Sequence, residues 1–279
     1  MPKKKPEIQE TAKTTKRKGA RSMAEIPPEV LEILNSGKIE TANLMEWLAV
    51  DQKRLLEVFL KQNKRQEYLE PIILKLKDLD STGKATAGKK SAIISAELLQ
   101  IVYKEKDEEL LKLLSHHRSD TVRCWAAFMI GNDENLSLAE MFEKIEIFAD
   151  DKHFGVRELA WLTTRPRTAK ELKASIKILT NWAKDKAEGS RRFASEITRP
   201  RGVWCKHINE LKENPSLALP ILEPLKTDSS KYVCDSVGNW LNDAAKSNPE
   251  WVLALCEKWL AESNSKETQY IIKKAKRSL

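Results

Sequence analysis

The sequence lacks the features that mark membrane, secreted and zinc-binding proteins. It has no 18-residue apolar run and no apolar segment at its start of the kind found in secretory signals, so we expect a soluble, intracellular protein with no membrane partner. Its 4 cysteines have no CxxC spacing, which predicts buried free thiols, and we expect no metal and no cofactor. Glycine is sparse, at 9 residues in 279, and no segment alternates polar and apolar residues long enough to indicate a strand.

Positive charge is concentrated at the N-terminus. Residues 1–22 carry eight Lys and Arg against two Glu, and so hold +6 of the net charge of +8. They lack apolar residues at helical spacing, which predicts a disordered basic tail over residues 1–22. Three roles stay open for this tail: contact with phosphates, a nuclear address, or solubility alone. Because the rest of the chain is almost neutral, basicity alone is poor support for nucleic-acid binding by the body.

Turn residues divide the remaining sequence into two helical parts. We expect an N-terminal helical region over residues 23–79, a loop over 80–90 and a repeat region over 91–279. Within the repeat region, Leu172, Ile176, Leu179 and Trp182 fall on one face of a helix. Trp125 lies on a similar apolar stripe, and we expect both Trp125 and Trp182 in the core.

The repeat region contains two segments that echo each other. Residues 156–167 match residues 190–201, and Arg157 lies 34 positions before Arg191 and 34 after Arg123. A repeat of this length made of helix pairs is typical of stacked helical arrays. The sequence therefore predicts an all-α fold, a right-handed superhelical α-solenoid of HEAT-like helical repeats, and we expect a monomer. Stacking would line one surface with the second helix of each pair.

The regularly placed arginines have two possible roles. Their guanidinium groups could contact phosphates on the shared surface. They could instead be structural, bonding backbone carbonyls or an Asp between repeats, as repeat proteins often use Arg. The residues alone leave both alternatives open.

Two motifs in the C-terminal half resemble those of a known family. The first is R-R-x-A-S-E-x-x-R-P-R-x-x-W, over residues 191–204, and the second is Y-V-x-x-S-V-x-N-x-L-N-D-x-A-K-x-x-P, over residues 232–249. From about Val156 to Leu279 the chain resembles the DNA alkylation repair family, the HEAT-like-repeat 3-alkylpurine DNA glycosylases. It is more similar to the AlkC branch than to the AlkD branch.

The resemblance implies a DNA repair enzyme. Members of the family bind duplex DNA on a concave basic surface and excise cationic N3- or N7-alkylated purines, with carboxylates stabilising the oxocarbenium that forms on the sugar. We therefore expect alkylated double-stranded DNA as the partner, at the bacterial nucleoid in the cytoplasm or in a eukaryotic nucleus. Two alternatives are a catalytically inactive protein of the same fold that binds bent, branched or damaged DNA, and a general protein scaffold.

The resemblance also implies site residues. Glu196 and Asp243 match the carboxylates of the AlkC branch, and Trp161 stands where the family has another Glu. An indole there could stack on the base or sugar, and Trp240 lies beside the same region. The predicted DNA contacts are Arg123, Arg157, Arg165, Arg191, Arg192, Arg199, Arg201, Lys231 and Lys246.

Each site residue also has a structural alternative. Glu196 could form an ion pair with Arg192 one turn earlier, and Asp243 could pair with Lys246. Trp161, Trp204 and Trp240 could be core residues, since each lies between apolar and charged segments. The sequence does not decide among these alternatives.

Overall fold

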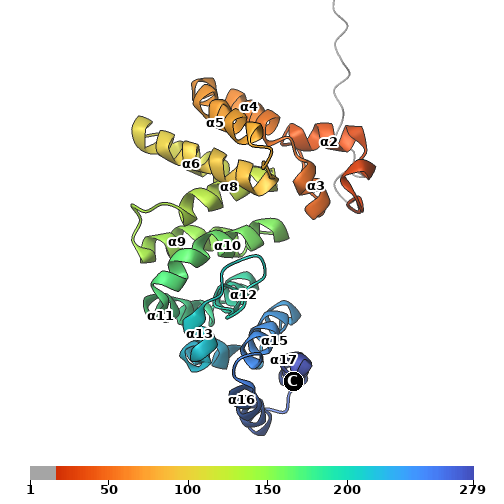
Figure 1. Ribbon diagram of the computed structural model, residues 1–279, viewed down its shortest axis with the longest axis vertical. Coiled ribbons are helices and arrows are strands. Elements are labelled where there is room, and N and C mark those ends of the chain that lie inside the picture. Colours follow the sequence, from red (N-terminus) through yellow and green to blue (C-terminus); the bar gives the residue numbers. More distant parts are fainter. Residues whose placement is uncertain (1–16) are drawn as a thin grey trace, which may run out of the picture. The chain divides into compact units, whose positions relative to one another are not determined.

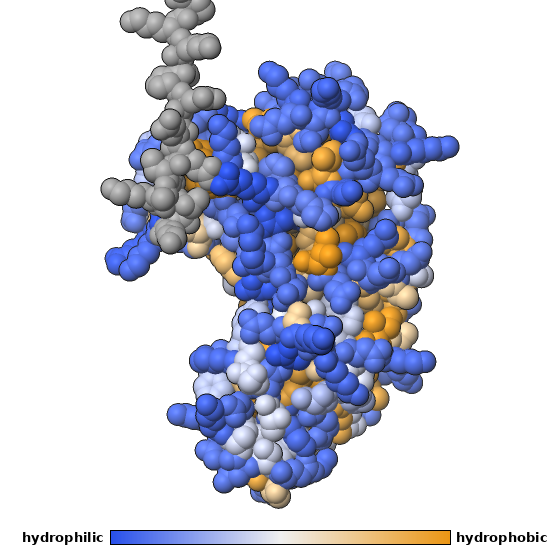
Figure 2. Space-filling model, turned by 180° about the vertical axis from the view of Figure 1, so that it is seen from behind, coloured by the Kyte–Doolittle hydropathy of each residue, from blue (hydrophilic) through white to orange (hydrophobic). Residues whose placement is uncertain are grey.

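The computed structural model describes residues 17–279, and the chain divides into two compact units. The first ends at Met129 and the second spans Ile130–Leu279. The described residues form helices and turns with no strand, which confirms the all-helical class. None of their helices is long and apolar enough to cross a membrane. Hydrophilic side chains cover most of the face in Figure 2, with apolar patches between them.

The first unit contains the shorter helices of the chain. They are α2 (Pro28–Asn35), α3 (Leu44–Ala49), α4 (Gln52–Gln62), α5 (Leu69–Ser81), α6 (Ala87–Glu105), α7 (Glu108–Ser115) and α8 (Asp120–Gly131), whose last residues belong to the second unit. Trp125 of α8 is fully buried, as expected, and its Nε1 donates to Gln52 Oε1 at 3.2 Å.

The second unit is built from helix pairs. Its helices are α9 (Leu138–Ala149), α10 (Phe154–Lys170), α11 (Leu172–Trp182), α12 (Glu188–Ile197), α13 (Asn209–Glu213), α14 (Leu219–Leu222), α15 (Lys231–Ala245), α16 (Pro249–Glu262) and α17 (Lys266–Ala275) (Figure 1). The second helices of successive pairs pack in series, α10 on α12, α12 on α15 and α15 on α17. This series places segments far apart in the sequence side by side.

Close helix packing in this unit depends on small residues. A Cβ on Gly238 of α15 would lie 2.7 Å from Lys274 Cβ and 3.2 Å from the Ile271 carbonyl oxygen of α17. Glycine at this position therefore lets the two backbones approach. On α11 the predicted apolar stripe is buried, including Trp182, which confirms that this face forms core.

Two predicted boundaries differ from the structure. The loop expected over residues 80–90 is short, because α5 continues to Ser81 and α6 begins at Ala87, and the two helices pack on each other. The predicted tail lies mostly outside the described residues, but Arg17 is described: it pairs with Glu46 of α3 and donates to the Glu40 carbonyl at 2.9 Å. The ordered body therefore begins before residue 23.

The repeated arginine has the same contacts in three helix pairs. Arg123, Arg157 and Arg191 each lie one turn inside a second helix, and each Nη1 donates to the carbonyls five and six residues earlier. For Arg191 the distances are 2.8 Å to Lys186 and 3.0 Å to Asp185. These carbonyls follow the end of the preceding helix, where no further turn satisfies them. The arginine thus closes the turn within each pair.

The accepting turn also repeats, and the repeat extends to a fourth pair. The side chains of Asp151, Asp185 and Asp228 each accept the backbone N–H two residues later, at 2.7 to 2.8 Å. His117 Nδ1 does the same for Ser119 at 3.0 Å. In the fourth pair Cys234 takes the place of the arginine, and its Sγ donates to the Asp228 carbonyl at 3.0 Å.

The repeated arginines also reach beyond their own turn. Arg191 forms a two-bond ion pair with Asp228, at 2.6 and 3.0 Å, which ties the α11–α12 turn to the turn before α15. Arg157 Nε donates to Tyr232 Oη at 3.1 Å. Of the two roles left open by the sequence, the structure shows the structural one for this set.

Replacement of Arg191 tests this role. Asp228 has a side chain only 5% exposed, so Arg191→Ala leaves a buried carboxylate without its partner. We expect the free energy of unfolding to fall by about 3–5 kcal/mol in urea titrations of the full chain. Arg191→Ala combined with Asp228→Asn, which retains the turn acceptor, should lose less than the two single losses together.

The exposed Arg277→Ala serves as the matched control, since Arg277 donates only to Asn239 and Lys274 at the surface. Its effect should stay within about 0.5 kcal/mol. A loss of similar size in Arg191→Ala would contradict the structural assignment.

Candidate functional site

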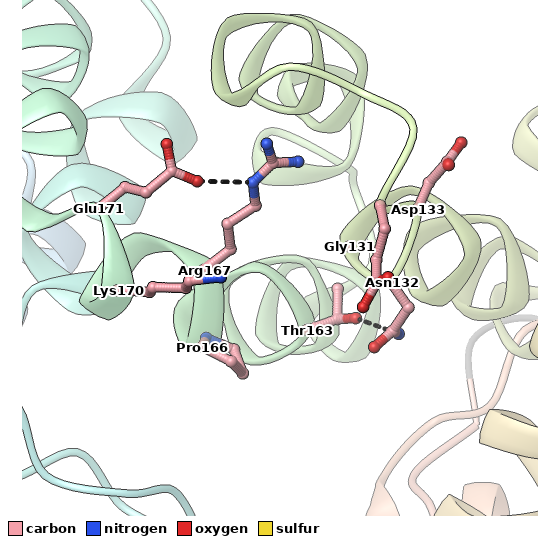
Figure 3. A pocket seen from close by; sticks show the side chains of 9 residues that line it. Gly131, Asn132, Asp133, Thr163, Pro166, Arg167, Lys170 and Glu171 are labelled. Atoms are coloured by element: carbon pink, nitrogen blue, oxygen red, sulfur yellow. Dashed lines mark hydrogen bonds and ion pairs between the residues drawn. The ribbon is translucent and has the colours of Figure 1, made fainter.

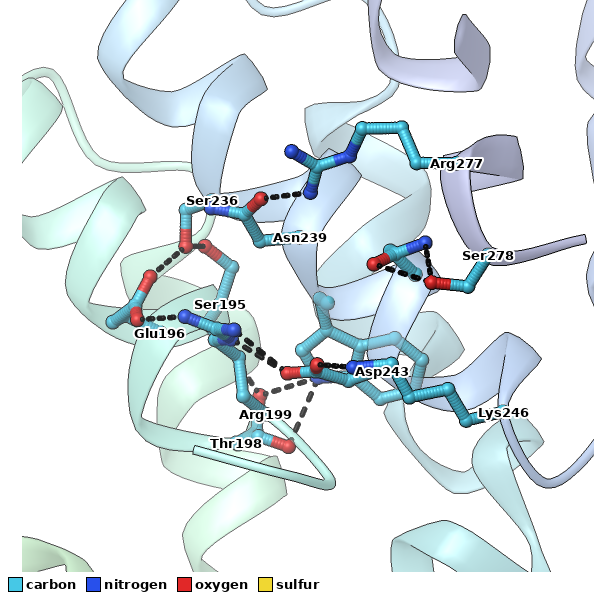
Figure 4. Close-up of polar contacts among 12 residues, drawn as sticks. Ser195, Glu196, Thr198, Arg199, Ser236, Asn239, Asp243, Lys246, Arg277 and Ser278 are labelled. Carbon is cyan, nitrogen blue, oxygen red and sulfur yellow. Dashed lines mark hydrogen bonds and ion pairs between the residues drawn. The ribbon is translucent and has the colours of Figure 1, made fainter. Parts of the chain in front are cut away.

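Arg199 joins the two predicted carboxylates. Glu196 lies in the last turn of α12, Arg199 follows the end of this helix, and Asp243 lies in α15 (Figure 4). Arg199 Nη1 donates to Glu196 Oε1 at 2.7 Å, while its Nε and Nη2 lie 2.9 and 2.8 Å from Asp243 Oδ2. Successive repeats therefore bring Glu196 and Asp243 together, as the sequence predicts.

Glu196 is buried and fully paired. Its Oε2 accepts from Ser236 Oγ at 2.7 Å, and Ser236 in turn accepts from Ser195 Oγ at 2.8 Å. Arg192 lies 3.5 Å from the same carboxylate, so the ion pair considered as an alternative is also present. Burial alone would raise the pKa of Glu196, but the charges of Arg192 and Arg199 outweigh it and hold the pKa below the ordinary 4.5. Glu196 is an anion at neutral pH.

Asp243 is nearly as enclosed. Its side chain is 6% exposed, and besides Arg199 it has Lys246 at 3.5 Å, one turn later on the edge of α15. Lys246 itself is 45% exposed. The expected i,i+3 pair is thus present as the outer end of a buried network.

The two tryptophans proposed for the site are core residues. Trp240 is fully buried, and its Nε1 donates to the Thr198 carbonyl at 2.9 Å. Trp161 is 3% exposed and donates to Glu158 Oε2 at 2.8 Å. Neither indole presents a face to solvent, which favours the core alternative over direct stacking on a base. Both help to position polar groups around the carboxylates.

Arg192 and Arg157 share an aromatic partner. Their guanidinium carbons lie 4.7 and 5.1 Å from the ring centroid of Tyr232 on α15. Such contacts stabilise a cation between helices. The pKa of Arg192 is raised, because the nearby Glu196 and Glu158 outweigh the opposing effect of burial. The predicted DNA contacts Arg157 and Arg192 therefore take part in helix packing.

Arg165 fastens the loop that follows α12. It is 2% exposed and donates to the carbonyls of Ile197, Arg199 and Lys206, at both ends of the loop. Burial lowers the pKa of its guanidinium, with Arg199 adding to this and nearby anions opposing it. A predicted DNA contact is thus a buried structural residue, whereas Arg201 in the same loop reaches the surface and donates to Ser247 Oγ at 2.6 Å.

Trp204 is the exposed aromatic side chain of this loop. It is 94% exposed and has a φ of 63°, in the left-handed region that non-glycine residues seldom adopt. The sequence left its burial open. Its place at the end of the R-P-R-x-x-W motif is the signal that could have marked it as a surface residue.

The remaining predicted cation lies at the start of α15. Lys231 pairs with Asp235 at 2.7 Å and lies over the Tyr270 ring at 5.2 Å, with a side chain 73% exposed. Lys231, Lys246 and Arg201 are therefore the predicted DNA contacts that keep exposed surface, while Arg123, Arg165, Arg192 and Arg199 are buried and Arg157 and Arg191 are half-buried.

A separate hollow of about 510 Å³ lies at the beginning of the second unit, between α10 and the turn after α8 (Figure 3). Asn132 Nδ2 donates to Thr163 Oγ1 at 3.2 Å on one side of it, and Arg167 pairs with Glu171 at 3.0 Å on the other. Lys170 and Asp133 add charges of both signs. This mixed lining has none of the paired carboxylates of the network around Arg199.

The cysteines are all free, and Cys124, Cys234 and Cys256 are buried as expected. Cys205, in the loop held by Arg165, is half-buried. Burial raises the pKa of the Cys234 thiol to about 11, with Asp228 adding to the effect, so it stays protonated at neutral pH. Residues 17–279 contain no cluster of His, Cys, Asp and Glu able to hold a metal ion.

The sequence model of a known family, described as "DNA alkylation repair enzyme", matches residues 166–279. This range contains Glu196, Arg199 and Asp243. The resemblance to the DNA alkylation repair family is confirmed. The uncharacterised protein YhaZ of Bacillus subtilis is 38% identical over 146 residues, which is 52% of this chain and 40% of YhaZ.

Solved structures with the alkylation-repair fold are also similar to this chain. Pseudomonas fluorescens alkylpurine DNA glycosylase AlkC, solved with DNA containing an abasic site analogue, is 24% identical with a TM-score of 0.64. That match covers 93% of this chain and 65% of AlkC. AlkD2 from Streptococcus mutans is 28% identical over 66% of this chain and 88% of its own, with a TM-score of 0.53. The smu.31 protein of Streptococcus mutans is 26% identical, covering 75% and 98%, with a TM-score of 0.55. This chain spans only part of YhaZ and AlkC.

Replacement of Arg199 tests the alkylation-repair network directly. Arg199→Met leaves Glu196 and Asp243 buried without their shared cation, and we expect a loss of about 3–5 kcal/mol in unfolding free energy at pH 7. In the wild type, the lowered pKa of Glu196 gives stability that is present above pH 4.5 and lost as the pH falls below it. The variant lacks this contribution, so its deficit should shrink as the pH falls through this range.

Urea titrations of both proteins between pH 7 and pH 3.5 measure this difference. A deficit that stays constant over the range would show that Arg199 does not hold these carboxylates in their charged form.

Proposed function

We propose that this protein is a DNA repair glycosylase that binds duplex DNA and excises cationic N3- or N7-alkylated purines. The single observation that carries the proposal is the joining of Glu196 and Asp243 by Arg199 across two successive repeats. The family match over residues 166–279 and the similarity to AlkD2 support the same activity.

The chemistry needs little more than negative charge beside the sugar. An alkylated purine of this kind already carries a positive charge, so it leaves without protonation by a general acid. The barrier lies in the oxocarbenium character that develops on the deoxyribose, and fixed carboxylates stabilise that charge. Glu196 meets this requirement because its lowered pKa keeps it ionised.

The exposed cations beside the network suit contact with DNA. Arg201 and Lys246 lie at the outer edge of α12 and α15, and Trp204 projects from the same loop as Arg201. Cationic side chains of this kind bind phosphates and position a duplex. We assign phosphate contacts to Arg201, Lys246 and Lys231, and a stacking contact to Trp204.

A DNA-binding protein without catalysis is the second candidate. The observation that favours it is the pairing of both carboxylates with Arg199 in the absence of DNA, which spends their charge on structure. Trp161, at the position where the resemblance implies a further Glu, favours it as well. Direct measurement of base release separates the two candidates.

Purified protein should release 7-methylguanine or 3-methyladenine from alkylated duplex DNA. Asp243→Asn keeps the shape of the side chain and removes its charge, so we expect the rate of release to fall by about 10²–10³-fold. Binding of undamaged duplex should change little, because Asp243 contacts no phosphate in this account. Chromatography of the released bases gives the rate, and fluorescence anisotropy gives the affinity.

Release at the wild-type rate by Asp243→Asn would exclude this residue from catalysis. No release by the wild type, combined with tight duplex binding, would favour the second candidate.

Phosphate contact by the exposed cations has its own test. The logarithm of the binding constant should fall linearly with the logarithm of salt concentration, because bound cations displace counterions. Arg201→Ala and Lys246→Ala should each weaken binding and reduce the slope by about 1. Lys258→Ala, at an exposed ion pair with Glu223 on α16, is the control and should leave the slope unchanged. Unchanged slopes in all three variants would place the duplex elsewhere.

A further inference from the structure

A third carboxylate is linked to the network from the preceding repeat. Glu158 lies on α10, one turn before Trp161, and its Oε2 accepts from Trp161 Nε1 at 2.8 Å. Its Oε1 pairs with Arg192 Nη1 on α12 at 2.7 Å. Because Arg192 also lies 3.5 Å from Glu196, Glu158 belongs to the same array of charges, which spans α10, α12 and α15.

Glu158 differs from the other two carboxylates in exposure. Its side chain is 34% exposed, against 5% for Glu196 and 6% for Asp243. A group that contacts a sugar or an attacking water must be reachable from outside the fold. Among these three carboxylates, Glu158 meets that condition to the greatest degree.

The partners of Glu158 hold it in a fixed orientation. One oxygen is bound by a buried indole N–H, and the other by a guanidinium that lies over the Tyr232 ring. Fixed donors of this kind reduce the reorganisation that a catalytic carboxylate needs when charge develops near it. Each oxygen still has a free lone pair for a water molecule, since a carboxylate oxygen accepts two bonds.

We propose that Glu158 is the catalytic carboxylate that binds the attacking water and faces the sugar, with Glu196 and Asp243 supplying buried negative charge behind it. This inference rests on the proposed function. In the step, the bond from C1′ to the purine nitrogen breaks and its electron pair leaves with the purine, which becomes neutral. The water oxygen bonds to C1′, and one water proton passes to the Glu158 carboxylate and then to solvent, leaving an abasic hemiacetal.

Single-turnover release of 7-methylguanine from alkylated duplex tests the assignment. Glu158→Gln keeps the size of the side chain and removes its charge and basicity, so we expect the rate to fall by about 100-fold with duplex affinity unchanged. Glu171→Gln is the matched control, because Glu171 is a 40%-exposed carboxylate that follows α10 and pairs with Arg167. Its rate should equal that of the wild type.

Trp161→Phe provides a second, independent variant. It keeps an aromatic core residue but removes the N–H that orients Glu158, so the rate should fall several-fold in kcat with KM unchanged. This variant decides the question if Glu158→Gln fails to fold, as judged by circular dichroism.

The outcomes separate the inference from the function on which it rests. Base release by the wild type and equally by Glu158→Gln, or by a folded Trp161→Phe if the former does not fold, would overturn the role of Glu158 and leave the glycosylase proposal intact. No release by the wild type would overturn both.

Discussion

The buried cation of Arg199 is the interaction on which the candidate site depends. Two carboxylates from different repeats lie within hydrogen-bond distance of one guanidinium, and neither would be stable as an anion at that depth without it. The same contacts fix α12 against α15, so the packing of the array and the arrangement of charge are set together. A site made in this way is preorganised, because its negative charges are held in place before any substrate arrives.

The arginines of the chain divide by exposure into two groups with different roles. Those at the 34-residue spacing close the turn within each helix pair, and Arg165 fastens the loop after α12. Arg201 and Lys246 keep exposed surface beside the carboxylates. A regular spacing of cations in a repeat protein is therefore not by itself a DNA-binding signal, because the repeated turn creates its own demand for donors.

Much of the fold could be predicted from the sequence, since helical periodicity and a repeat length are local properties. The joining of Glu196 to Asp243 followed from the motif and from stacking of repeats. The burial of Trp240, the exposure of Trp204 and the link from Glu158 to Arg192 could not be predicted, because each depends on which neighbouring helix covers the side chain. The extent of the 80–90 loop was wrong for a related reason: Gly83 and Gly88 indicated a turn, but Gly88 lies inside α6, where packing on α5 outweighs its low helix propensity.

The central claim is that this array of carboxylates stabilises positive charge on a deoxyribose held in duplex DNA. The most direct test compares the affinities for two duplexes, one with a cationic pyrrolidine analogue of the abasic sugar and one with the neutral tetrahydrofuran analogue. A site complementary to the oxocarbenium binds the cationic analogue more tightly, by about 10²-fold or more, and this preference is lost in Asp243→Asn. Equal affinities for the two duplexes would contradict the account.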